Sequence, residues 1–275
     1  MPDSPLPAPT DLRHDLAVET ISSTIVDVPT VRRHKLSSLS VTAQSYVFVR
    51  LRLGNGVEGI GEAATLGGPR WSEESVEGIK ATIDTYLAPA LIGARADRFE
   101  QARLRLDEAA KRNNAAKSAL ETALIDAVGK TLGLPAVALL GGAVRDRMPV
   151  LWTLASGDPG QEIEEAEGKL GARLHDTFKV KIGAQEPEAD LARLRRLAHA
   201  LEGRASLIVD ANQAWDETVA IRCLPALGEL GVRLVEQPVP AWNVPGLARV
   251  RARSPVPLMA DECVFSPHDL LAVAT

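Results

Sequence analysis

Four short apolar runs that each end in charged residues limit the folds open to this chain more than any other feature. The runs are DTFKVKIG, SLIVDANQAW, VRLVEQPV and PLMADECV, and stretches with helical character such as EADLARLRRLAHALEG separate them. Strands that alternate regularly with helices are typical of βα units, whose strands form a parallel sheet. The sequence therefore predicts an α/β fold with a parallel sheet over residues 176–262.

Charged side chains stand at the carboxyl ends of these predicted strands, the edge at which such sheets keep their chemistry. They are Lys179 and Lys181, then Asp210, then Glu236, then Asp261. Three carboxylates at one edge would repel one another in a partly desolvated site, and a divalent cation would remove that repulsion. Carboxylate oxygens favour a hard ion, Mg²⁺ or Mn²⁺. The alternative interpretation is that each acid is a solvated loop residue or a helix N-cap.

The two lysines lie two residues apart on one strand, so their side chains share a face, whereas Val180 faces the opposite side. If that face lines a barrel, each ammonium disfavours the other and brings a lysine pKa towards neutrality. Such a lysine can take a proton from a carbon next to a carboxylate, and a metal can stabilise the resulting enediolate. The alternative is an ordinary sheet whose lysines face solvent.

The N-terminal part of the chain predicts a different, α+β domain over residues 19–147. The strand-like runs TISSTIVDV, AQSYVFVRLRL and VEGIGEA come first, and Gly54-Asn55-Gly56 between the last two is a strong hairpin signal. Three stretches with helical patterns follow, at about Ser72–Tyr86, Arg98–Lys111 and Asn114–Leu132. Residues 1–18 are rich in proline, and we expect them to form a flexible arm.

Residues 148–275 predict the first five βα units of a barrel, with Met148–Leu154 as its first strand. A closed barrel of this kind typically uses about 250 residues, so only about half of one is expected here.

Composition narrows the class of protein. The formal net charge is −5, and no basic block indicates a nucleic-acid or anionic-membrane surface. No apolar run approaches the roughly 18 residues that a membrane span needs. The two cysteines, Cys223 and Cys263, form no CxxC pair, which favours a reducing compartment. We therefore expect a cytoplasmic protein.

These residues resemble the enolase superfamily and, within it, the muconate lactonizing enzymes, the muconate and chloromuconate cycloisomerases. The likeness covers about residues 20–275 and includes IVDVPTVRRHKL, GVEGIGEA, WTLASGD, FKVKIGA, VDANQAWDE, VEQP and MADE. FKVKIG followed by VDANQAWDE is specific to the cycloisomerase group, whereas the spacing of the lysines and acids alone indicates only the superfamily. The resemblance implies an N-terminal α+β capping domain followed by a (β/α)7β barrel of the TIM type, here incomplete.

The resemblance also implies roles for the residues at the strand ends. Asp210, Glu236 and Asp261 match the metal ligands of the family. Lys181 matches the lysine that exchanges a proton with the carbon alpha to the carboxylate. Lys179 matches its partner, which supports the charge on the carboxylate and tunes the base.

Substrate contacts follow less directly. Asn212 stands where the family has a polar neighbour of the metal site. Two loops of the capping domain, about Val31–Ser40 and Ala63–Trp71, would close over the barrel mouth and choose the substrate. His34 and Lys35 in the first loop are candidate substrate contacts, and the alternative is that both are merely solvated.

The implied reaction is the reversible cycloisomerisation of cis,cis-muconate, or a substituted muconate, to muconolactone in catechol breakdown. The implied partners are a small dicarboxylate substrate, Mn²⁺ or Mg²⁺, and further copies of the chain in a homo-oligomer. Dipeptide epimerases, N-acylamino-acid racemases and o-succinylbenzoate synthases share the lysine pair and the three acids, and remain alternatives.

The family continues through strands six to eight, which carry a further lysine and acid. We therefore interpret the sequence as a fragment of a longer protein, the alternative being an inactive truncated product.

Overall fold

A computed structural model describes residues 16–35, 40–65, 68–70 and 73–274, without the side chains of His34, Lys35 and Arg70. These residues form two compact units, 16–31 with 42–146 and 32–41 with 147–274. Each unit has a hydrophobic core of its own. Within the described part of the chain, no helix combines the length and the apolarity needed to cross a bilayer. Most of the expected arm lies outside the described residues, and Leu16 and Val18 at its end are buried.

The N-terminal unit is built on a three-stranded sheet with the order β1-β2-β3. Its strands are β1 (Val18–Lys35), β2 (Ser40–Leu53) and β3 (Glu58–Ala64). The predicted hairpin is confirmed, because β2 and β3 pair antiparallel with Arg52 opposite Glu58. Gly56 in its turn has φ +83°, a left-handed conformation that favours glycine. The stretch expected as a loop, Val31–Ser40, differs from the prediction because β1 continues as strand to Lys35.

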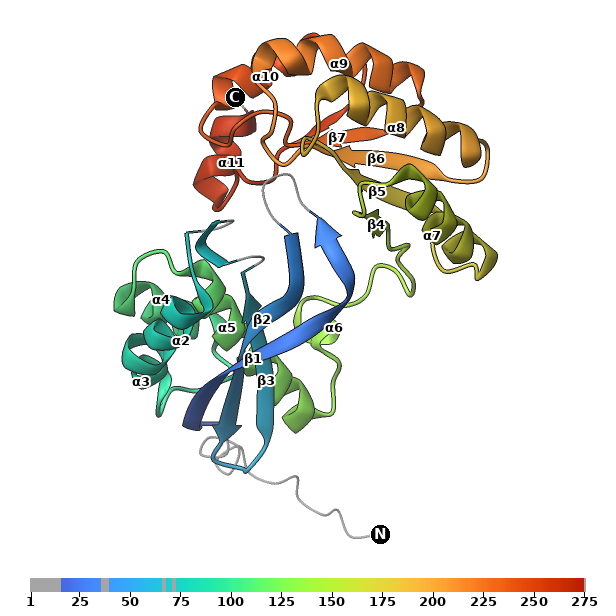
Figure 1. Ribbon diagram of the computed structural model, residues 1–275. Coiled ribbons are helices and arrows are strands. Elements are labelled where there is room, and N and C mark those ends of the chain that lie inside the picture. Colours follow the sequence, from blue (N-terminus) through green and yellow to red (C-terminus); the bar gives the residue numbers. More distant parts are fainter. Residues whose placement is uncertain (1–15, 36–39, 66–67, 71–72, 275) are drawn as a thin grey trace. The chain divides into compact units, whose positions relative to one another are not determined.

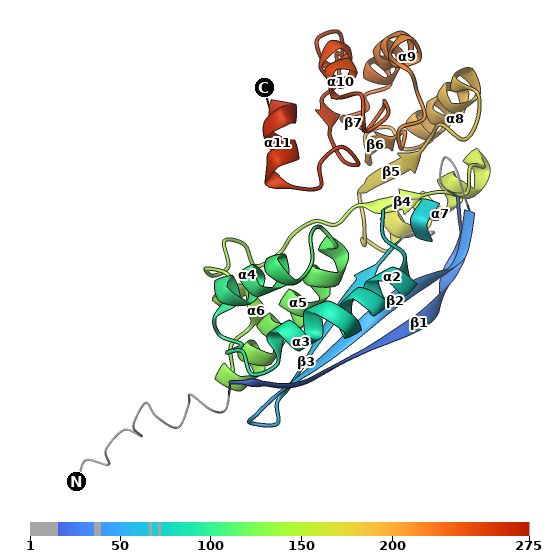
Figure 2. The same ribbon diagram turned by 90° about the vertical axis from the view of Figure 1, so that its left-hand side faces the viewer.

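Helices cover one face of this sheet, as Figures 1 and 2 show. They are α2 (Val76–Thr82), which continues through the π-helical turn η2 (Ile83–Leu87) into α3 (Ala88–Leu91), then α4 (Phe99–Ala109), α5 (Asn114–Leu132) and the short α6 (Ala136–Leu139). A single 3-10 turn, η1 (Gly68–Arg70), precedes them. The third predicted helix coincides with α5, whereas the first begins later than expected, at Val76.

Helix α5 lies unusually close to β3 because small residues face each other across the contact. A Cβ atom added to Gly61 would lie 1.9 Å from the carbonyl oxygen of Ala119, and one added to Gly59 would lie 2.0 Å from that of Ala123. The carboxylate of Asp126 on the same helix accepts the backbone N–H of Ile60 at 2.8 Å. No larger residue fits at either glycine without moving the helix.

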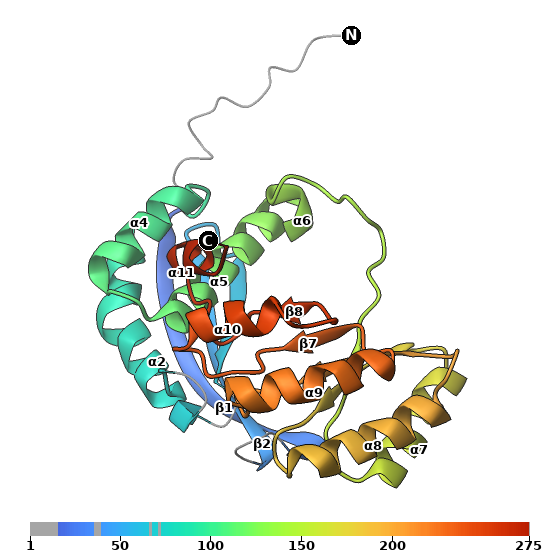
Figure 3. The same ribbon diagram turned by 90° about the horizontal axis from the view of Figure 1, so that it is seen from above.

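The C-terminal unit contains a five-stranded parallel sheet whose strands follow in sequence order. The strands are β4 (Trp152–Leu154), β5 (Thr177–Lys181), β6 (Ser206–Asp210), β7 (Leu234–Glu236) and β8 (Leu258–Met259). The helices between and after them are α7 (Pro159–Gly171), α8 (Pro187–Ala200), α9 (Glu217–Glu229), α10 (Val244–Arg251) and α11 (Pro267–Ala274). Helices α7 to α10 lie along one face of the sheet (Figure 3). The prediction of consecutive parallel βα units, part of a barrel, is confirmed.

The first strand of this sheet is shorter than predicted. Strand β4 begins at Trp152 rather than Met148, because its pairing with β5 starts only at Trp152 opposite Phe178. The residues before it, 148–151, are exposed and have no neighbouring strand to pair with among the described residues.

We predict that Gly61→Ala destabilises the N-terminal unit, because the added methyl group meets the backbone of α5. The loss expected for such overpacking is about 1–3 kcal/mol. Gly78→Ala in α2 is the matched control, since its Cβ would meet only the Ser75 hydroxyl at 3.4 Å. Urea unfolding of both variants provides the test, and a Gly61→Ala variant as stable as the control would show that this contact is not tight.

Candidate active site

The ends of three neighbouring strands place four charged side chains in one row. Lys181 lies opposite Asp210 in the β5–β6 register, and Asp210 lies opposite Glu236 in the β6–β7 register. Lys179 precedes Lys181 by two residues on β5 and therefore projects from the same face. The intervening Val180 is buried in the core of the unit.

The carboxylate of Asp210 is the centre of this row. Its Oδ2 atom lies 2.6 Å from Nζ of Lys181 and 2.9 Å from Nζ of Lys179. Lys179 also contacts Oε1 of Glu236 at 2.6 Å, so its ammonium group bridges two carboxylates. The other oxygen of Asp210, Oδ1, accepts the backbone N–H of Asn212 at 2.9 Å. Asp210 is fully buried, and these contacts compensate its charge.

Asn212 connects this row to the loop after β8. Its Oδ1 accepts a hydrogen bond from Nζ of Lys181 at 2.9 Å, and its Nδ2 donates to Oε1 of Glu262 at 3.2 Å. The backbone at Asn212 has φ +44°, and that at Gln237 has φ +35°. Left-handed backbone outside glycine is uncommon and gathers at functional sites, where surrounding contacts maintain it.

Burial and the lysine ammonium groups shift the pKa values of Glu236 and Asp210 in opposite directions. Burial raises the pKa of Glu236 to about 7, because the single ammonium of Lys179 offsets it only in part. Burial acts in the same direction on Asp210, but Lys181 and Lys179 outweigh it and hold the pKa of Asp210 below its usual value. The pKa of Lys179 is raised, since Asp210 and Glu236 outweigh its burial. The expectation that each ammonium disfavours the other and brings a lysine pKa towards neutrality is therefore wrong for Lys179.

The third predicted metal ligand does not join this group. Within residues 16–35, 40–65, 68–70 and 73–274, no three histidine, cysteine, aspartate or glutamate side chains gather closely enough to hold a metal ion. Asp261 is exposed, and its backbone N–H donates to Oε1 of Gln237 at 2.8 Å while the next residue, Glu262, is buried. The donor set nevertheless suits a hard cation, because Asp210 and Glu236 already hold a positive charge, the Lys179 ammonium, between them.

The residues predicted to contact the substrate are described by the structure only in part. The side chains of His34 and Lys35 are not among the described ones. The second expected loop, Ala63–Trp71, is described only in part.

Sequence reasoning missed two buried polar contributors to the site. Glu262 is the last residue of the motif MADE and directly follows the predicted ligand Asp261. It accepts a hydrogen bond from Asn212, which is the residue that the sequence predicts near the metal site. Gln237 follows Glu236 directly and is fully buried, with its Nε2 donating to the carbonyl of Val239 at 2.9 Å. Gln237 and Glu262 could both have been predicted as site residues, because each is a polar residue that directly follows an acid near the end of a strand.

Comparison with known proteins matches both units to family models. Residues 20–141 match the model described as "Mandelate racemase / muconate lactonizing enzyme, N-terminal domain", and residues 161–275 match "Enolase C-terminal domain-like". Muconate cycloisomerase 1 of Pseudomonas putida is 49% identical over 94% of this chain and 69% of its own length. The chain belongs to the muconate and chloromuconate cycloisomerase family of the enolase superfamily.

Other family members agree with this assignment in sequence and in structure. Chloromuconate cycloisomerase of Pseudomonas sp. (strain P51) is 45% identical over 91% of this chain and 68% of its own. The crystal structure of the muconate lactonizing enzyme from Pseudomonas fluorescens complexed with muconolactone superimposes with a TM-score of 0.93 at 48% identity. That superposition covers 95% of this chain and 70% of the crystallised one. The resemblance drawn from the sequence is therefore confirmed.

We predict that Lys179→Met lowers the free energy of unfolding by about 3 kcal/mol, because it leaves the buried carboxylates without their shared ammonium. Arg222→Met is the matched control, since its ion pair with Glu188 is exposed and its loss costs about 0–1 kcal/mol. Urea unfolding in metal-free buffer measures both. Equal stability losses in the two variants would contradict the central role given to Lys179.

Proposed function

We propose that this protein is a muconate cycloisomerase that interconverts cis,cis-muconate, or a chloro-substituted muconate, with muconolactone. The observation that carries the proposal is the row of Lys181, Asp210 and Glu236 at neighbouring strand ends, in a chain 49% identical to a muconate cycloisomerase. A structure of a relative bound to muconolactone supports the choice of substrate.

Lys181 is proposed to exchange the proton at the carbon alpha to the substrate carboxylate. In the direction of ring closure, a carboxylate oxygen bonds to the diene and the alpha carbon takes a proton from Nζ. In the reverse direction Nζ takes that proton while the ring C–O bond breaks. The contacts of Nζ with Asp210 and Asn212 support this role, because they hold the proton-carrying atom at a fixed place.

Lys179 is proposed to support the negative charge that develops on the substrate carboxylate. A divalent cation, Mn²⁺ or Mg²⁺, held by Asp210, Glu236 and Asp261 would supply further positive charge beside that carboxylate. The donor chemistry supports these ligands, since carboxylate oxygens suit hard ions. Of the three proposed ligands, Asp261 is the exposed one.

Other features stay predictions that the family resemblance supports. They are a capping domain over residues 19–147, barrel units over 148–275, substrate contacts from His34 and Lys35, and a homo-oligomer. A cytoplasmic location has support from Cys223 and Cys263, both of which are free thiols.

The proposal is tested by following the loss of diene absorbance when the 275-residue chain is mixed with cis,cis-muconate and Mn²⁺. Turnover is the result that supports the proposal, and Lys181→Ala is then expected to lower kcat by about 100-fold to 10,000-fold, the usual share of a general acid or base. Lys111→Ala is the control, because Lys111 is exposed and lies in the other unit. A Lys181→Ala variant with unchanged kcat would overturn the role of this lysine.

Metal ligation is tested separately from turnover. Glu236→Gln removes a charged ligand, and we expect it to weaken Mn²⁺ binding by about tenfold or more in isothermal titration calorimetry. Glu188→Gln on the exposed surface is the control and should bind Mn²⁺ as the parent chain does. Equal Mn²⁺ affinity in the two variants would rule out Glu236 as a ligand.

A further inference from the structure

A second cluster of buried charges lies at the end of β5, and none of the roles described above uses it. It consists of Arg193 on α8, Glu162 on α7 and Asp190 on α8, which are 6%, 0% and 1% exposed. Nη1 of Arg193 contacts both carboxylate oxygens of Glu162 at 2.8 and 2.9 Å, and Nη2 contacts Oδ1 of Asp190 at 3.0 Å. One guanidinium group therefore joins two carboxylates from two helices.

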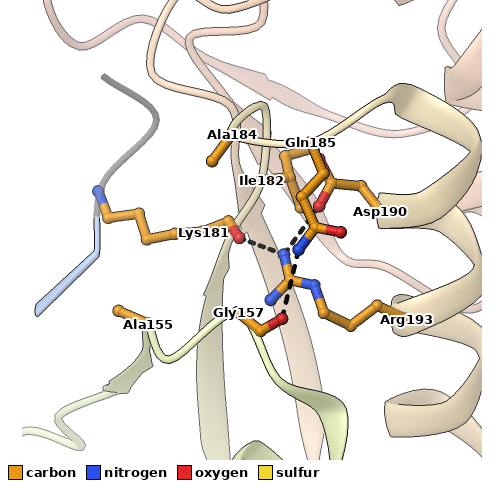
Figure 4. A pocket seen from close by; sticks show the side chains of 8 residues that line it. All are labelled: Ala155, Gly157, Lys181, Ile182, Ala184, Gln185, Asp190 and Arg193. Atoms are coloured by element: carbon orange, nitrogen blue, oxygen red, sulfur yellow. Dashed lines mark hydrogen bonds and ion pairs between the residues drawn. The ribbon is translucent and has the colours of Figure 1, made fainter. Parts of the chain in front are cut away.

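The same guanidinium group holds the main chain of the candidate proton donor. Nη2 of Arg193 donates to the backbone carbonyl of Lys181 at 2.5 Å. Figure 4 shows the carbonyl of Lys181 turned toward Arg193, while its side chain extends the opposite way. Lys181 is thus fixed at its backbone by one ion cluster and at its Nζ by another, since Nζ contacts Asp210.

The two carboxylates of the cluster fix the loops that follow β4 and β5. Oε1 of Glu162 accepts the N–H of Gly157 at 3.0 Å, and Oδ2 of Asp190 accepts the N–H of Gly183 at 2.7 Å. Gly183 has φ +89°, and a Cβ there would lie 2.3 Å from that of Ala214, so the chain beyond β5 has little freedom.

Stability alone does not account for charges in this place. Buried ion pairs repay their desolvation poorly, and well-packed apolar residues of similar volume are often as stable. What an apolar replacement cannot do is donate to the carbonyl of Lys181 in a defined direction. The planar guanidinium meets this carbonyl and two carboxylates at once, which a lysine ammonium at the same place cannot match.

We propose that Arg193, oriented by Glu162 and Asp190, is a positioning residue for Lys181. It holds the backbone from which the long lysine side chain reaches the substrate, and so sets where Nζ stands. The proposal rests on the function proposed above, in which Lys181 transfers the proton.

The test compares Arg193→Met with Leu194→Ala, a control that removes buried packing from the neighbouring position on α8. Both are studied with the full chain at a temperature at which circular dichroism shows them folded. Misplacing a reacting group by about 1 Å costs about 100-fold in rate. We therefore expect Arg193→Met to lower kcat by about that factor with KM little changed, and Leu194→Ala to keep kcat. Arg193→Lys should resemble Arg193→Met, because lysine restores the positive charge but not the planar set of N–H donors that reaches the carbonyl and both carboxylates at once.

A second readout does not depend on turnover. The rate at which acetic anhydride modifies Lys181, measured by mass spectrometry relative to exposed Lys111, reports how firmly Nζ is held. We expect Arg193→Met to raise this rate about tenfold, because freeing the backbone loosens the contacts of Nζ with Asp210 and Asn212. Leu194→Ala should leave it unchanged.

The two readouts separate failure of this proposal from failure of the proposed function. If the parent chain does not turn over muconate, the proposed function fails for this chain, and the labelling rate still decides whether Arg193 positions Lys181. Equal labelling of Lys181 in Arg193→Met and Leu194→Ala would overturn the positioning role. Recovery of kcat in Arg193→Lys would also overturn it, since charge balance alone would then suffice.

Discussion

The burial of the Asp210 carboxylate imposes the arrangement of the residues around it. A carboxylate removed from water is costly unless positive charge and hydrogen bonds surround it. Here Lys181, Lys179 and the backbone N–H of Asn212 provide both, at distances of 2.6 to 2.9 Å. Because these partners come from β5 and from the turn after β6, the charge of Asp210 ties together the two strand ends at which the proposed proton transfer takes place.

Strand β5 is consequently held on both of its faces and at its end. Lys179 and Lys181 meet the acids on one face, while Phe178, Val180 and Ile182 belong to the hydrophobic core on the other. At the end of the strand, Arg193 fixes the carbonyl of Lys181 from α8. A catalytic side chain works best when its own backbone and rotamer are held by neighbouring contacts. The charges on either side of β5 therefore have one common effect, which is to reduce the freedom of Lys181.

The periodicity of the sequence predicted the parallel strands, the hairpin at Asn55 and the shared face of the two lysines. These features depend on alternation along a single segment, which is visible in the residues themselves. The limits of β4 were missed because they depend on where β5 offers a partner. The raised pKa of Lys179 and the exposed Asp261 depend on contacts between segments far apart in sequence. The pairing of Arg193 with Glu162, 31 residues away, leaves no local signal for the same reason.

The most direct test is the anomalous diffraction of manganese from crystals of the chain grown with Mn²⁺. If Asp210 organises the site as described, one strong peak should lie against the carboxylates of Asp210, Glu236 and Asp261. The Nζ atom of Lys179 should then have moved from its place between Asp210 and Glu236, while Lys181 keeps its contact with Asn212. A peak elsewhere, or bound manganese with Lys179 still bridging the two acids, would contradict the account.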